Sequence, residues 1–72
     1  MHVMKMISDK AVFFIFLQEK YAELKNISSK SVLKLWKENK LIDYINNMYE
    51  QYHTERVENA IQDIDNKLAK NV

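Results

Sequence analysis

Ala11-Val12-Phe13-Phe14-Ile15-Phe16-Leu17 is the most apolar stretch of the sequence, and the other segments can be arranged around it. Polar residues return after it at helical spacing, while Tyr21 continues its apolar stripe. We therefore predict one long helix over residues 9–25. Val12 and Ile15 lie on the opposite side of this helix, so its first two turns are apolar all round and need contacts on every side.

Three shorter helices are predicted downstream, over residues 29–38, 41–52 and 55–69. In each segment apolar residues recur every three or four positions, and a polar capping residue or a short polar turn precedes it. The pattern predicts an all-α protein, a small four-helix bundle built around the first helix. Short connections make consecutive helices spatial neighbours.

Length and composition fit one small domain. The chain has 72 residues and contains no Cys, Gly or Pro, so disulfides, thiolate metal sites and Gly-rich phosphate loops are all excluded. We expect a single helical domain over residues 8–72, preceded by an N-terminal tail over residues 1–7. A chain this short buries only about 60% of the surface that its unfolded form exposes.

We expect the apolar stretch to be neither a membrane span nor a secretory leader. Seven residues fall well short of the roughly 20 that cross a bilayer. Gln18-Glu19-Lys20 follows it where a leader would have small residues for cleavage. We expect a cytoplasmic protein without membrane contact.

The residue types of this sequence give little support for a catalytic or metal-binding site. His2 and His53 are far apart in sequence, and no Cys is available, so no metal site is predicted. Asp63 and Asp65 are two positions apart on a helix and point to different sides, so they cannot act as a facing acid–base pair. We expect neither an enzyme nor a bound cofactor.

Aromatic residues form the more informative pattern. Eight of the 72 residues are Phe, Tyr or Trp, and several lie at the margins of their apolar stripes. Such rings either complete the core or form a recognition face, because Tyr and Trp are common interface anchors. We predict a non-catalytic protein-binding module, with either Asp63 and Asp65 or the lysines of the second predicted helix steering the approach of the partner. The predicted contact residues are Ile15, Trp36, Tyr44, Tyr49 and Tyr52.

Two alternatives remain open. The second predicted helix presents a narrow arc of lysines that could contact nucleic-acid phosphates or simply face solvent; it comprises Lys30, Lys34 and Lys37, with Lys40 nearby. The following helix would bring Asp43 and Glu50 to the groove, which weakens a helix-turn-helix interpretation. The other alternative is a homodimer that fills the spare apolar surface with a second copy.

The order of local motifs resembles a family of small bacterial helical domains of unknown function. The resemblance covers residues 11–69 and rests on Ile27-Ser28-Ser29-Lys30, Leu33 to Trp36, Asp43-Tyr44-Ile45, Tyr52-His53-Thr54 and Asp63-Ile64-Asp65. Members often carry Gly at the positions of Ser29 and near Arg56, whereas this chain has neither Gly. The last helix is therefore expected to begin earlier than in relatives.

The resemblance also implies a partner. Such domains are often encoded beside a small ADP-ribosyltransferase-like protein, in an arrangement similar to a toxin–antitoxin pair. The chain would then be the antitoxin-like member of such a pair. The resemblance supplies no catalytic residues.

Overall fold

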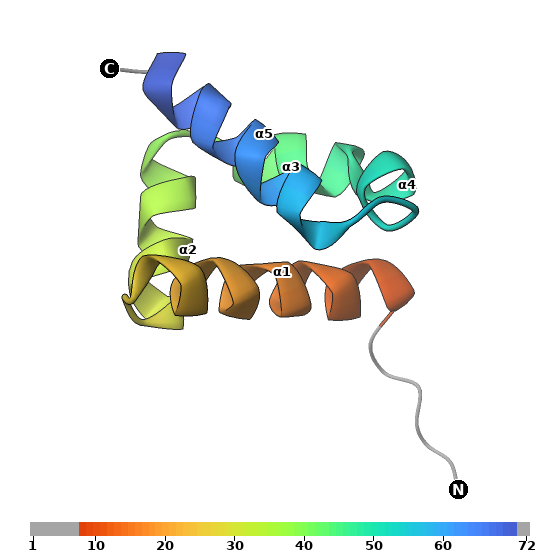
Figure 1. The fold of residues 1–72 in the computed structure, drawn as a ribbon, viewed down its shortest axis with the longest axis horizontal. Helices are drawn as coiled ribbons and strands as arrows, with labels where there is room; N and C mark the ends of the chain where they lie inside the picture. Colours follow the sequence, from red (N-terminus) through yellow and green to blue (C-terminus); the bar gives the residue numbers. More distant parts are fainter. Residues whose placement is uncertain (1–7, 71–72) are drawn as a thin grey trace, which may run out of the picture.

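The computed structural model describes residues 8–70, and these residues form five helices and no strand (Figure 1). The helices are α1 (Asp9–Lys25), α2 (Ser29–Glu38), α3 (Ile42–Asn47), α4 (Tyr49–Tyr52) and α5 (Val57–Lys70). The all-α prediction is confirmed. The predicted N-terminal tail lies outside the described residues.

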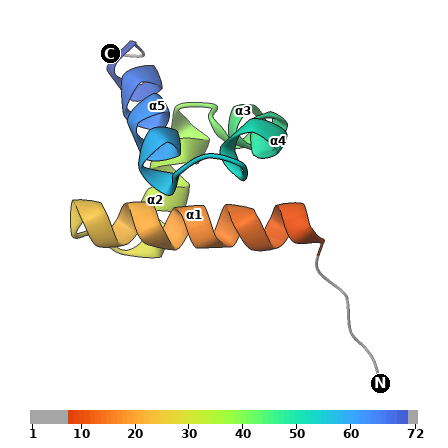
Figure 2. The ribbon, with the colours of Figure 1, turned by 45° about the vertical axis from the view of Figure 1, so that its right-hand side comes forward.

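The arrangement is organised around α1. This helix runs along one side of the molecule, α2 turns away from its C-terminal end, and α3, α4 and α5 lie together over it (Figures 1 and 2). Each of the other four helices contacts α1. No helix within residues 8–70 is long and apolar enough to cross a membrane.

Two of the predicted helices have the expected bounds and two do not. The helices over 9–25 and 29–38 are confirmed, and the hydroxyls of Ser8 and Ser28 accept hydrogen bonds from backbone N–H groups in their first turns. The helix predicted over 41–52 is wrong as a single unit, because it breaks at Met48. There the backbone N–H is shared between the carbonyls of Tyr44 and Ile45, which tightens the turn.

The last helix begins at Val57 instead of residue 55. The preceding residues form a turn in which the N–H of Thr54 donates to the carbonyl of Gln51 and that of Glu55 to the carbonyl of Tyr52. These hydrogen bonds prolong the end of α4. The chain therefore uses residues 53–56 to reverse direction before α5 can start.

α1 and α2 both end without glycine, and the backbone conformation at each end directs the chain into the next helix. Asn26 and Lys40 adopt left-handed backbone conformations, with φ of 58° and 60°. At each end a backbone N–H folds back onto the helix, from Ile27 to the Ala22 carbonyl at 3.0 Å and from Leu41 to the Trp36 carbonyl at 2.8 Å. Asn tolerates this conformation well, whereas Lys does so at some cost.

The core lies between α1 and the other helices. Its most fully buried large side chains are Leu17, Val32, Trp36, Ile45, Tyr52 and Ile64. The Trp36 ring meets Phe14 and Tyr21 of α1 edge-on, with centroid distances of 5.6 and 5.5 Å. One side of α1 is thus fixed by packing, and its opposite side faces outward.

Candidate functional site

Two carboxylates of α5 hold the helices together on the inner side of the molecule. Asp63 Oδ2 accepts hydrogen bonds from the hydroxyls of Tyr44 of α3, at 2.6 Å, and Tyr52 of α4, at 2.5 Å. The Tyr52 ring is buried, so this carboxylate satisfies a phenol that water does not reach. Asp63 therefore connects α5 to both short helices.

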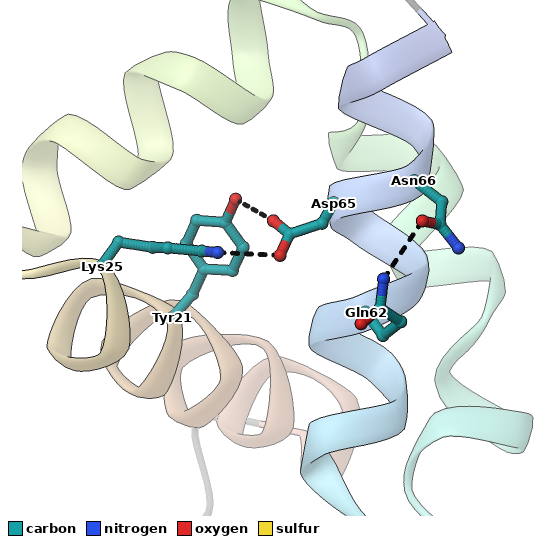
Figure 3. A network of polar contacts seen from close by, with 5 residues as sticks. All are labelled: Tyr21, Lys25, Gln62, Asp65 and Asn66. Atoms are coloured by element: carbon teal, nitrogen blue, oxygen red, sulfur yellow. Dashed lines mark hydrogen bonds and ion pairs between the residues drawn. The ribbon is translucent and has the colours of Figure 1, made fainter.

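Asp65 makes the corresponding connection to α1. Its carboxylate accepts a hydrogen bond from the Tyr21 hydroxyl at 2.6 Å and pairs with the Lys25 ammonium at 2.8 Å (Figure 3). Asp63 and Asp65 thus point to different neighbours, as expected for positions two apart on a helix. Both carboxylates act as structural acceptors.

The proton equilibria of these groups follow from their contacts. Burial, together with the hydrogen bond and the charge of Asp65, raises the pKa of Tyr21 well above its ordinary value of 10.0. Burial and Asp63 do the same to the pKa of Tyr52. Partial burial acts to raise the pKa of Asp63. The hydrogen bonds from the two phenols and the charges of Lys67 and Lys70 outweigh this effect and hold the pKa below its ordinary value of 3.8.

The outward side of α1 is apolar in its first half and acidic in its second. Val12, Ile15 and Phe16 are 53%, 45% and 48% exposed. Glu19 and Glu23 follow on the same side of the helix and are also exposed. We call these five residues the outer face of α1. A helix whose other side is packed into a core cannot rotate to hide them.

A row of rings continues from the outer face onto α4. The ring centroid of Phe16 lies 6.1 Å from that of Phe13, and the centroid of Phe13 lies 5.6 Å from that of Tyr49. Tyr49 stacks on His53, with 4.4 Å between the ring centroids. Phe13 and Tyr49 are partly buried, whereas Phe16 and His53 are exposed. The row joins the outer face to the turn after α4.

The structure separates the predicted contact residues into inner and outer groups. Trp36 is 0% and Tyr52 is 2% exposed, so both are part of the core, and their prediction as contact residues is corrected. Tyr44, Asp63 and Asp65 bond within the chain. The structure leaves Ile15 exposed and Tyr49 partly so.

The sequence groups Val12 with Ile15 on one side of the first helix, but Val12, Phe16, Glu19 and Glu23 were not among the predicted contact residues. Their spacing of three and four places them on one side of a helix. That spacing was the feature of the sequence from which a shared surface could have been predicted. It identifies the outward side only once Leu17 and Tyr21 are known to point inward.

Other features carry less chemistry. Lys30, Lys34, Lys37 and Lys40 are exposed, and no ion pair within residues 8–70 involves them. The same residues contain no cluster of three or more His, Asp or Glu side chains suited to a metal ion. A hollow of about 470 Å³ lies beside the α2–α3 turn, where the Lys67 ammonium sits 4.5 Å from the Tyr44 ring centroid.

A comparison with known families matches most of this chain. The family described as "Protein of unknown function (DUF3791)" matches residues 12–71, which include all but the first three residues of α1 and the whole of α2 to α5. The chain belongs to this family. The DUF3791 match therefore contains both Asp–Tyr connections and the outer face of α1. Neither the curated proteins nor the solved structures give a match to this sequence.

Proposed function

We propose that this DUF3791 chain is a non-catalytic protein-binding module whose contact surface is the outer face of α1. The observation that carries the proposal is the exposure of three apolar side chains from two successive turns, Val12, Ile15 and Phe16, on a helix whose other side is packed into the core. Exposed apolar side chains that gather on one face typically mark an interaction site. Single exposed apolar residues need no such explanation.

The magnitude of the apolar contribution limits what this face can do alone. Full burial of one such side chain stabilises by about 1.5–3 kcal/mol, and these three are already about half-buried. Covering them thus contributes roughly 3 kcal/mol, which is less than the cost of association. A stable complex needs further contacts, which the ring row and the carboxylates of the outer face can provide.

The finer proposal concerns the partner and the cell. The resemblance to bacterial domains encoded beside an ADP-ribosyltransferase-like protein favours an antitoxin-like role in the cytoplasm, in which the chain binds and neutralises that toxin. This role needs no catalytic residue on the present chain. It predicts a stable complex with the product of the adjacent gene.

Replacing Phe16 with glutamate is expected to weaken that complex by about 30-fold or more, because a charge then faces the apolar centre of the contact. Calorimetry or co-purification with the adjacent gene product measures the effect. Leu24→Glu is the matched control, since Leu24 is 55% exposed on the same helix but lies outside the outer face. Equal affinity of wild type and Phe16→Glu would remove the outer face from the contact.

The exposed lysine arc of α2 favours nucleic-acid binding as the second candidate function. Phosphate contacts give an affinity that falls steeply with salt. The test is binding to duplex DNA at low salt, compared with the variant carrying Lys34→Glu and Lys37→Glu. Undetectable binding, or binding that this variant leaves unchanged, eliminates the candidate.

A further inference from the structure

The spacing and charge of the outer face indicate which kind of partner segment it fits, and this inference rests on the proposed protein-binding function. We infer that this face accepts an amphipathic helix with an apolar half and a basic half. Val12, Phe16, Glu19 and Glu23 are spaced by four, three and four residues, the spacing of a coiled-coil seam. At 1.5 Å per residue the seam is roughly 16 Å long, about three helical turns.

The seam is divided by chemistry. Its first two positions, Val12 and Phe16, are apolar, and its last two, Glu19 and Glu23, are acidic. A helix packed along it must place apolar side chains against the first pair and cations against the second, because uncompensated carboxylates at a contact oppose association. Arginine fits well, since its guanidinium binds a carboxylate in a bidentate way.

The carboxylates are available for such a partner. Glu23 pairs with Lys20 at 3.7 Å, but its side chain is 73% exposed, so this ion pair is weak and easily exchanged. No ion pair in the described part of the chain involves Glu19. Both acidic positions of the seam can therefore meet a partner's cations without breaking an internal structure.

A second copy of this chain does not satisfy the seam. Parallel pairing of two outer faces places each Glu19 and Glu23 beside its own equivalent, where like charges repel. Antiparallel pairing centred on Phe16 brings Glu23 toward Asp9 of the other copy. Charge complementarity thus favours a different, basic partner helix, and it equally disfavours nucleic acid on this face.

The test uses two synthetic helical peptides of about 14 residues that differ only at the charged half of the seam. One has two leucines and two arginines at the seam positions, and the other has glutamates in place of the arginines; each is made in both orders of its halves. Chemical-shift titration of the isotope-labelled full chain at low salt measures affinity. We expect the arginine peptide to bind at least about tenfold more tightly and to shift Phe16 and Glu19.

Charge reversal on the protein provides the decisive comparison. The variant with Glu19→Lys and Glu23→Lys is expected to prefer the glutamate peptide. The variant with Glu38→Lys and Asp43→Lys has the same change in net charge at exposed positions away from the outer face, and it should keep the original preference. Circular dichroism verifies that both variants remain helical.

Three results would overturn the inference. They are equal binding of the two peptides, no binding of either, and a dimer of the chain itself with its contact shifts on Val12 and Phe16. The proposed function has a separate outcome. If Phe16→Glu weakens binding of a native partner but peptide binding does not depend on the peptide's charge, the protein-binding proposal stands and only the basic partner helix is rejected.

Discussion

Above about pH 10 the free energy of unfolding is expected to fall steeply, because two buried phenols must keep their protons in the folded state. The pKa values of Tyr21 and Tyr52 are raised by burial and by the adjacent carboxylates. In the unfolded chain both phenols ionise near pH 10. Their stabilising contribution is thus fully present below that pH and is lost as the pH rises toward the folded-state pKa.

The magnitude follows from proton linkage. Each phenol that stays protonated only in the folded state lowers stability by about 1.4 kcal/mol per pH unit, so the pair gives nearly 3 kcal/mol per unit. A domain of this size has roughly 4–11 kcal/mol in total. Two pH units above the ordinary tyrosine pKa should therefore remove much or all of it.

Urea unfolding measured by circular dichroism at about pH 9 and about pH 11 tests this expectation. Tyr52→Phe is the matched comparison, because it keeps the ring of Tyr52 in the core while removing the hydroxyl that titrates. The loss of stability with pH should be smaller in this variant, by about 1.4 kcal/mol per unit. Parallel pH profiles of wild type and variant would show that Tyr52 ionises freely in the folded protein.

The sequence predicts α1 and α2 well because their determinants are local. Ser8 and Ser28 cap them through hydrogen bonds to residues three positions away. The break at Met48 has no local sign, since neither Gly nor Pro is available to mark it. It results from a shift in backbone hydrogen bonding near the core, which periodicity does not report.

The candidate site shows a similar division. Helical spacing places Asp63 and Asp65 on different sides of α5, but it does not identify their phenol partners, which come from 11 to 44 residues away in sequence. Trp36 lies within the apolar side of its helix, and its complete burial depends on rings contributed by α1. Long-range packing decides which apolar residues of α1 remain outside.

Replacing Asp63 with alanine is expected to lower the free energy of unfolding by about 2–3 kcal/mol and the melting temperature by about 10–20 °C. The change removes a charged acceptor from two phenols and leaves the buried Tyr52 hydroxyl without it. Partial exposure of Asp63 keeps the expected loss below that of a fully buried pair. Thermal and urea unfolding measure both quantities.

Asn66→Ala is the control, because Asn66 lies on the same helix with an exposed side chain that accepts a hydrogen bond from the exposed Gln62 side chain at 3.2 Å. A loss for Asp63→Ala no greater than for this control would mean that the carboxylate does not hold α5 to α3 and α4. A double-mutant cycle with Tyr52→Phe separates the hydrogen bond from other effects of the substitution. We expect a coupling energy of about 1–2 kcal/mol. Asp63→Ala alone leaves the buried Tyr52 hydroxyl unpaired, whereas the double variant has no such hydroxyl, so its loss of stability is smaller than the sum of the two single losses.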